Sequence, residues 1–265
     1  MNRVDNVNAF VLHQRQYRET SSIIDFYTEG GPLRAVCKGV HGSSKNAIRL
    51  RATLQPFAEL SLSWFGRGEL KTVRHVESMG TPAALRHNVL FAAMYLNELL
   101  LRLAPGNEQD GQSPLYKLYK STLSSMLQLQ QGATANDAPI HIGLEACLRT
   151  FELQLLEDTG FAVDFNYVWH DGQPIVADRQ YFFDPQHGFA EHSAATLDNA
   201  RGQRPALAGV GTDVRAVLYP GWVIARIGER DFSDAEVRRY AKQLARHALA
   251  PQLGERPLKT RELFR

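Results

Sequence analysis

Basic side chains without acidic neighbours occupy one stretch of the chain, Gly30–Phe57. No Asp or Glu lies between Glu29 and Glu59, and besides His41 the stretch holds Arg34, Lys38, Lys45, Arg49 and Arg51. This pattern suits a nucleic-acid backbone, because phosphates attract Lys and Arg and repel nearby carboxylates. The sequence therefore predicts DNA contacts here, and a solvated loop that happens to be basic is the alternative.

A second basic segment follows at the turn Gly66–Gly68, where Arg67 is joined by Lys71 and Arg74. Trp64 and Phe65 directly precede the turn. Aromatic rings beside Arg can stack on nucleic-acid bases. Such rings can equally fill the interior of a small β-domain, and both interpretations stay open.

One alternative would make the protein an enzyme. Glu69-Leu70-Lys71 matches half of a metal-dependent nuclease site, which needs a further carboxylate to share the metal ion, and Asp25 is the candidate. The chain has no GxxxxGK[ST] phosphate loop, no HExxH and no GxSxG. We therefore expect no catalytic residues and keep a nuclease using Asp25, Glu69 and Lys71 as the alternative.

Metal-binding residue types gather in one later segment, as His170, Asp171, Asp184, His187 and His192. A structural zinc site usually needs four Cys or His ligands, often in short paired spacings. The two cysteines, Cys37 and Cys147, are far apart and outside this segment. We therefore expect histidines that form hydrogen bonds, and neither a metal ion nor a cofactor.

Length and composition indicate a globular protein of roughly two domains. The chain has 265 residues, of which 44% are hydrophobic and 22% are charged. It has no apolar run of about 18 residues that could span a membrane, and its first residues lack the apolar core of a signal peptide. The low cysteine count favours a reducing, cytoplasmic location.

The formal net charge of +2 is unevenly distributed. Residues 1–80 hold 11 Lys or Arg against 7 Asp or Glu, and residues 235–265 hold 8 against 3. Residues 81–234 hold 11 against 18. Two basic ends around an acidic middle suggest separate surfaces for separate partners.

The first 80 residues predict a small β-domain. Five segments have strand-like apolar positions: 8–14, 22–27, 33–40, 54–65 and 70–76. Turn residues separate several of them, and the basic segment 39–46 is expected to be a loop. Five short strands favour a closed barrel of the OB type, although a short sandwich or an SH3-like barrel also fits.

Helical periodicity begins after residue 81. It predicts helices over 83–103, 113–131 and 142–159, the first of them apolar nearly all round and therefore buried. Residues 161–231 are irregular apart from a hairpin at 179–183 and 188–191. A capping box, Ser233 to Glu236, opens a last helix that Pro251 ends, with Arg239, Lys242 and Arg246 on its polar face.

Short blocks along the whole chain carry a family resemblance: Ala9–His13, Arg18–Ser21, Lys38–Gly39, Leu54–Phe57, Gly66–Thr72, Tyr95–Leu100, Arg149–Leu153 and Pro257–Phe264. In these blocks the chain closely resembles the RecO family of bacterial recombination mediators. The blocks run in family order from residue 9 to residue 264.

The resemblance implies an α+β, multidomain fold. Residues 1–80 would form the OB domain, 81–160 with 232–265 a helical domain, and 161–231 an irregular, zinc-ribbon-like region. Many relatives carry four cysteines in that region, whereas this chain has none between residues 161 and 231. Zinc is therefore not carried over.

The resemblance also implies a non-enzymatic, nucleoid-associated activity. The family binds single- and double-stranded DNA and anneals complementary strands. It binds the acidic C-terminal tail of single-stranded-DNA-binding protein, and with RecR it helps to load the RecA recombinase. The basic residues of 1–80 and of the last helix would neutralise the DNA backbones.

The helix over 142–159 has two apolar faces. Arg149 lies off the stripe expected to face the core and shares a second face with Leu153 and Leu156. This face either packs on the neighbouring helix or meets a partner. The resemblance favours the partner, because a tail ending in an apolar residue needs a pocket beside a cation. Lys117 and Lys120 would meet the acidic residues of the tail.

Overall fold

The computed structural model describes residues 3–80, 82–106, 113–132, 138–192 and 217–264. The chain divides into two compact units, Met1–Phe151 with Glu255–Arg265, and Glu152–Gly254. Strands and helices both contribute, so the predicted α+β, multidomain class is confirmed. The further division into three parts stays a prediction. None of the helices that the structure describes is long and apolar enough to cross a membrane.

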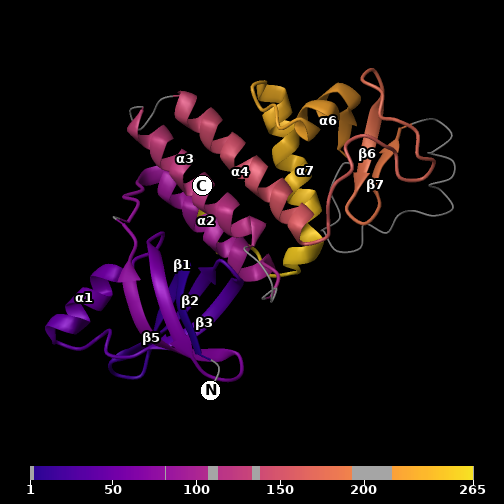
Figure 1. The fold of residues 1–265 in the computed structure, drawn as a ribbon. Coiled ribbons are helices and arrows are strands. Elements are labelled where there is room, and N and C mark those ends of the chain that lie inside the picture. The colour runs from indigo at the N-terminus through magenta and orange to yellow at the C-terminus, as the bar shows by residue number, and fades with distance from the viewer. Residues whose placement is uncertain (1–2, 81, 107–112, 133–137, 193–216, 265) are drawn as a thin grey trace. The chain divides into compact units, whose positions relative to one another are not determined.

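The first unit begins with a closed five-stranded barrel (Figure 1). Its strands are β1 (Arg3–Tyr17), β2 (Ser21–Thr28), β3 (Gly31–Cys37), β4 (Glu59–Phe65) and β5 (Leu70–Ser78). They follow the order β1-β2-β3-β5-β4, and β1 closes the barrel by antiparallel pairing with β4. Only β3 and β5 pair in parallel. The barrel is of the OB type that the five strand segments predicted.

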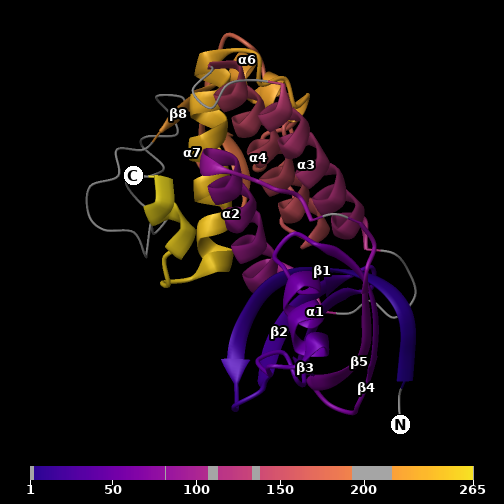
Figure 2. The same cartoon turned by 90° about the vertical axis from the view of Figure 1, so that its left-hand side faces the viewer.

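Helices complete the first unit (Figure 2). They are α1 (Lys45–Thr53), α2 (His87–Leu103), α3 (Pro114–Gln131), the first part of α4 (Ala138–Asp158) and the short 3-10 helix η1 (Lys259–Phe264). The three long helices confirm the periodicity seen in the sequence. The expectation that α2 is buried all round is wrong, because Met94 and Leu101 are each 39% exposed.

Strand β1 buries side chains on both of its faces. Ala9 and Val11 lie in the hydrophobic core of the barrel and are fully buried. Phe10 alternates with them, and its ring packs 5.3 Å from the ring of Tyr116 and 5.1 Å from that of Tyr119, both on α3. Because successive side chains of a strand point to opposite faces, β1 joins the barrel interior to the helices above it.

The main correction to the sequence analysis concerns residues 45–53. We expected a loop followed by a strand from residue 54, but the structure has helix α1 and a strand that starts only at Glu59. Ser44 caps the helix, since its side chain accepts a hydrogen bond from the Ala47 backbone N–H. Ala47 and Leu54 are buried at helical spacing, a short apolar pattern that the basic residues around it obscured.

A partly buried carboxylate fastens η1 to α2. The Glu98 side chain accepts hydrogen bonds from the backbone N–H groups of Lys259 and Thr260, both at 2.9 Å, and from the Thr260 hydroxyl at 2.6 Å. Burial alone would raise the pKa of Glu98, but these hydrogen bonds and the nearby Arg102 outweigh it and lower the pKa. The ionised carboxylate therefore holds the C-terminal segment in place.

Glu98→Ala should lower the free energy of unfolding at pH 7 by about 1.5–3 kcal/mol, the range for hydrogen bonds to a charged group. A carboxyl group whose pKa is lowered by folding stabilises above its unfolded pKa of about 4.3, and this contribution is lost as the pH falls. The difference between wild type and variant, measured by urea unfolding, should therefore shrink below about pH 4. An equal difference at pH 3 and pH 7 would contradict the role of the charge, and Glu98→Gln is the matched control.

In its described residues, 152–192 and 217–254, the second unit holds the later part of α4, a three-stranded sheet and two further helices. The sheet contains β6 (Gln180–Asp184), β7 (Gly188–Glu191) and β8 (Leu218–Pro220) in the order β7-β6-β8, and the helices are α6 (Gly221–Gly228) and α7 (Ala235–Leu253). The hairpin β6–β7 confirms the prediction. Strand β8 and helix α6 were missed, because elements of three and eight residues are too short to show periodicity.

Two details of the last helix also differ from the prediction. Asp234, rather than Ser233, is the N-cap of α7, and its side chain accepts from the Glu236 backbone N–H at 2.6 Å. The Ser233 hydroxyl instead donates to Asp231. Pro251 does not end the helix, which continues to Leu253, since only the last turn has to accommodate the missing N–H group.

Candidate nucleic-acid interface

Helix α1 presents much of the acid-free basic stretch. Lys38, Lys45 and Arg49 are exposed, the last two on successive turns of the same helix. Arg51 differs, because one of its guanidinium nitrogens donates to the backbone oxygens of Val40 (2.7 Å) and Gly42 (3.0 Å). Arg51 therefore holds the loop in shape, while the other three cations face solvent.

The loop that precedes α1 lies beside the turn between β1 and β2. The His41 backbone N–H donates to the Thr20 oxygen at 3.0 Å, and the His41 ring lies 2.8 Å from the Ser22 hydroxyl. This places Arg18, in the same turn and exposed, next to the loop. The sequence analysis missed Arg18, because Glu19 beside it interrupts the acid-free pattern.

A second group of cations lies around a hollow of about 350 Å³ in the first unit, lined among others by Asp25, Arg34, Glu69, Lys71 and Leu101. Arg67 belongs to the turn beside it. Arg34 forms an ion pair with Asp25 at 2.5 Å, and His13 lies 3.6 Å from the same carboxylate. Arg34 thus has a structural role besides any contact with DNA.

The same hollow brings together the three residues of the nuclease alternative. Asp25 and Glu69 both line it with Lys71. The Asp25 carboxylate is, however, already occupied by Arg34, which would repel a metal cation. In the parts of the chain that the structure describes, no group of three or more His, Cys, Asp or Glu could hold a metal ion.

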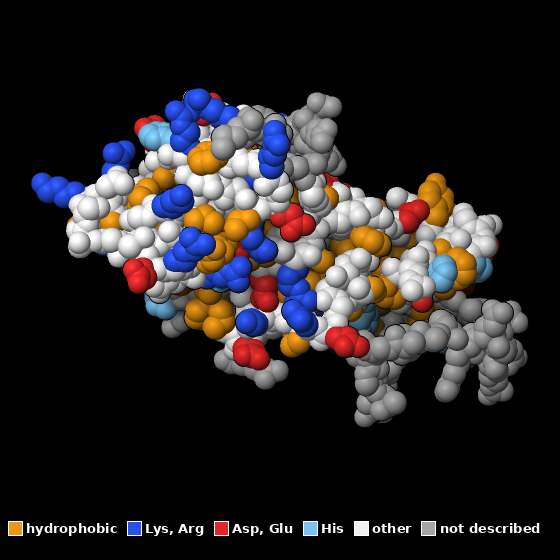
Figure 3. All heavy atoms as spheres, turned by 90° about the horizontal axis from the view of Figure 1, so that it is seen from below, with side chains coloured by type: hydrophobic (Ala, Val, Ile, Leu, Met, Phe, Trp, Pro, Cys, Tyr) orange, Lys and Arg blue, Asp and Glu red, His pale blue; other side chains and the backbone are white. Residues whose placement is uncertain are grey.

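The remaining barrel residues predicted to contact DNA or to stack on its bases differ in exposure and in partners. Arg74 is exposed and lies 3.5 Å from Asp5, which also pairs with Arg3. Trp64 is only 9% exposed and belongs to the barrel core, so its ring fills the interior and the stacking alternative is wrong for it. In Figure 3, Lys and Arg side chains gather over the barrel with hydrophobic and a few acidic side chains among them.

The second unit carries its own row of cations. Arg239, Lys242 and Arg246 are exposed along α7, at positions i, i+3 and i+7 of one helix face. Arg239 also lies 3.2 Å from Glu236 and 4.8 Å over the ring of Tyr240. The predicted polar face of this helix is confirmed as exposed.

The second face of α4 is not open as the partner prediction required. Arg149 is 6% exposed, Leu153 is 2% and Leu156 is 1%. Lys117 and Lys120 on α3 are exposed, and Lys120 forms an ion pair with Glu59 at 2.6 Å. Helical spacing predicts that an apolar face is covered, but it does not predict which group covers it. Here other parts of the same chain cover the face.

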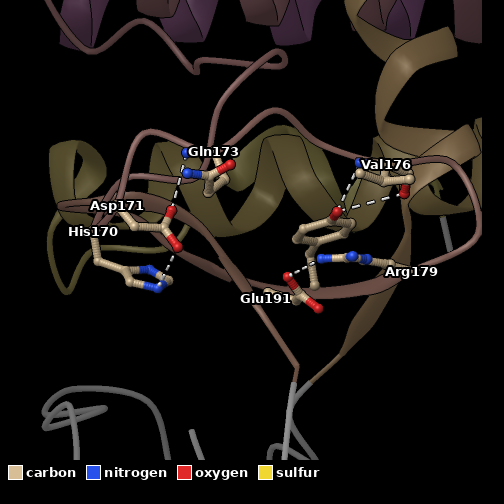
Figure 4. A network of polar contacts seen from close by, with 7 residues as sticks. His170, Asp171, Gln173, Val176, Arg179 and Glu191 are labelled. Atoms are coloured by element: carbon tan, nitrogen blue, oxygen red, sulfur yellow. Dashed lines mark hydrogen bonds and ion pairs between the residues drawn. The ribbon is translucent and has the colours of Figure 1, made fainter.

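Two of the three histidines considered as metal ligands pair with neighbouring carboxylates, whereas the ring of the third, His192, packs 4.9 Å from that of Phe182. The His170 ring faces the Asp171 carboxylate (Figure 4), and the two groups lie 3.3 Å apart. The His187 ring lies 3.0 Å from the Asp184 carboxylate. The Asp171 and Asp184 side chains also accept backbone hydrogen bonds from Gln173 and Gln186, so they shape their own turns. The residues present do not fit a structural zinc ion.

The cysteines are equally unsuited to a metal. Burial raises the pKa of Cys37 to about 11 and also raises the pKa of Cys147. Neither thiol is therefore activated as a nucleophile at neutral pH. Cys37 lies on β3 and Cys147 on α4, so the two belong to different elements.

Purified protein should carry no stoichiometric zinc, and a chelator should leave its melting temperature unchanged. The reason is that the ligand set needed for a structural zinc site is missing from residues 161–231 of the sequence. Elemental analysis and thermal melting with and without chelator measure this. A near-equimolar zinc signal would overturn the prediction and make His170, His187 and His192 ligand candidates.

Comparison with known proteins identifies the family. The family model described as recombination protein O, N terminal, matches residues 1–82, and the one described as recombination protein O, C terminal, matches residues 87–262. The chain belongs to the recombination protein O (RecO) family. The two RecO family models together cover the barrel and nearly all of the helices described above.

Similar RecO proteins match the chain almost from end to end. One is the DNA repair protein RecO of Pseudomonas aeruginosa (strain LESB58), 38% identical over 258 residues, which are 97% of this chain and 93% of that protein. Another is the DNA repair protein RecO of Yersinia pestis (strain Pestoides F), 35% identical over 97% of this chain and 92% of that protein.

Proposed function

We propose that this protein acts in DNA repair and recombination by binding single- and double-stranded DNA and annealing complementary strands. The observation that carries the proposal is the set of exposed cations on the barrel, Lys38, Lys45 and Arg49, in a stretch without carboxylates. Membership of the RecO family supports it, since the matched relatives are named DNA repair proteins.

Charge neutralisation would be the physical basis of annealing. Two strands must come close despite the repulsion between their phosphates, and cations that replace condensed counterions make this favourable. The basic residues of the barrel and of α7 supply such cations on both units of the protein. The process needs no covalent step, so the protein would act without catalytic residues.

A salt series tests the proposal directly. The logarithm of the binding constant for labelled single-stranded and duplex DNA should fall linearly with the logarithm of the salt concentration. The affinity should depend little on the DNA sequence. Mixing complementary strands should produce duplex faster with the protein than without it. A protein that only connects other proteins would show no DNA affinity even at low salt, and that result would refute the proposal.

The nuclease alternative remains because Asp25, Glu69 and Lys71 line one hollow. It predicts that labelled DNA incubated with the protein and Mg²⁺ becomes shorter. Unchanged length supports the annealing protein. Shortening that disappears in Asp25→Asn would instead establish the nuclease.

The partners follow from the family resemblance. We propose that the protein binds the acidic C-terminal tail of single-stranded-DNA-binding protein and, with RecR, promotes loading of RecA. Exposed Lys117 is suited to meet acidic residues of the tail, whereas Arg149 is buried. A role of Arg149 in binding the tail therefore requires the helix face to open.

Arg149→Ala distinguishes a tail site from a core position. Loss of binding to a labelled tail peptide, measured by fluorescence anisotropy at unchanged melting temperature and unchanged DNA affinity, would support the tail site. The loss should amount to about 1.5–3 kcal/mol, the range for a charged hydrogen bond. A lowered melting temperature with retained peptide affinity would show that Arg149 serves the fold alone.

A further inference from the structure

The turn between β1 and β2 combines an aromatic ring with a guanidinium group. Tyr17 is the last residue of β1 and pairs with Ser21 on β2. The guanidinium carbon of Arg18 lies 5.2 Å from the centroid of the Tyr17 ring. The Tyr17 side chain is partly exposed and Arg18 is exposed. The two flat groups thus meet at the surface of the barrel.

The backbone holds this arrangement at a cost. Arg18 has a φ of 56°, in the left-handed region that residues other than Gly adopt uncommonly. Gly at this position would relieve the strain but would remove the side chain that covers the ring. A strained turn that retains a functional side chain is a typical feature of binding sites.

One cation, Lys38, lies near this turn at the end of the neighbouring strand β3. The pairing of Ser22 with Cys37 places Lys38, the next residue, at the same end of β3 as Ser21 on β2. Neighbouring strands are about 4.8 Å apart, so Lys38 and Tyr17 are separated by roughly two strand spacings. The His41 backbone bonds to Thr20 in the same turn. A nucleic-acid strand whose phosphates contacted Lys38 would therefore have a base within reach of Tyr17.

We propose that Tyr17 and Arg18 form a stacking site for one unpaired base of single-stranded nucleic acid. The inference rests on the proposed DNA binding and adds a preference for single strands. Bases of a duplex are stacked on each other and cannot reach the ring, whereas every unpaired base offers a π-face. Glu19 in the same turn offsets the charge of Arg18, so the tip of the turn attracts phosphate less than Lys38 does and is better suited to a base.

Substitutions of Tyr17 test the site by affinity for labelled oligothymidylate and for a duplex of the same length. Tyr17→Leu keeps apolar bulk but loses the π-face, and should weaken single-strand binding roughly 5- to 100-fold, the range for one base–aromatic stack. Duplex affinity should change by less than about twofold, and the salt slope should stay unchanged, because no phosphate contact is lost. Tyr17→Phe should bind as the wild type does.

The matched control is Tyr167→Leu, an equally radical change at an exposed tyrosine of the second unit. Thermal melting confirms that each variant is folded. The proposal is overturned if Tyr17→Leu binds single strands as the wild type does. It is also overturned if single-strand and duplex affinity fall by the same factor, or if Tyr17→Phe is as weak as Tyr17→Leu. In all three cases DNA binding itself survives in the wild type, whereas a wild type without DNA affinity would refute the proposed function instead.

Discussion

Replacing Lys38, Lys45 and Arg49 together by Ala should flatten the log–log salt dependence of single-strand binding by about 2, since each lost phosphate contact contributes about 0.7. All three side chains are exposed. Arg51 is left unchanged, because it donates hydrogen bonds to carbonyl oxygens of the loop. The affinity near 0.1 M salt should fall on the order of 100-fold. Fluorescence anisotropy with labelled DNA across a salt series measures both quantities.

A charge-matched variant provides the control. Arg86, Arg179 and Arg226 are exposed and lie outside both basic ends, and their joint replacement by Ala changes the net charge equally. This control should leave the salt slope within about 0.5 of the wild type if binding is local to the barrel. Equal losses of DNA affinity in the two variants would show that only the net charge matters. An unchanged affinity in the variant of Lys38, Lys45 and Arg49 would show that α1 is not part of the DNA interface.

Asn97→Ala should lower the free energy of unfolding by about 2–6 kcal/mol. The Asn97 amide nitrogen donates to the Leu12 backbone oxygen at 2.9 Å, and its amide oxygen accepts from the Tyr119 hydroxyl at 2.5 Å. The Leu12 carbonyl needs this bond, because a bulge between Val11 and His13 takes Leu12 out of the β1–β2 ladder. Removing Asn97 leaves two buried polar groups without partners, each at a cost of about 1–3 kcal/mol.

Chemical denaturation of a double-mutant cycle checks this account. Tyr119→Phe alone removes only the hydroxyl, and the double variant Asn97→Ala/Tyr119→Phe should be less destabilised than the sum of the two single variants. Burial of Asn97 (5% exposed) and Tyr119 (fully buried) is what makes the network costly to break. Additive effects, or a loss below about 1 kcal/mol for Asn97→Ala, would contradict the network.

The sequence by itself determined the element types wherever periodicity runs long enough. Strand-like apolar segments over 22–27 and 70–76 predicted β2 and β5, and helical spacing over 83–103 and 113–131 predicted α2 and α3. Short motifs spread over the whole chain were enough for the family. The acid-free basic stretch was likewise visible in residue order alone, because charge pattern needs no geometry.

The short element α1 was decided only by the tertiary structure. A helix of nine residues is only marginally stable by itself, and α1 is stabilised by its Ser44 cap, by the buried Ala47 and by Leu54, which lies in the core of the barrel. A propensity argument could not foresee that contact. The helix in turn decides which cations of the stretch face solvent and which, like Arg51, hold the backbone.

Roles within the candidate sites also depended on neighbours distant in sequence. Arg34 and Arg49 look alike in the sequence, yet one pairs with Asp25 across the β2–β3 ladder and the other is exposed on a helix. Arg149 shares a face with Leu153 and Leu156 as predicted, and whether that face is covered depends on what packs against it. Residue order fixes the spacing of side chains along an element, but burial and ion pairing arise between elements, so only the tertiary structure decides them.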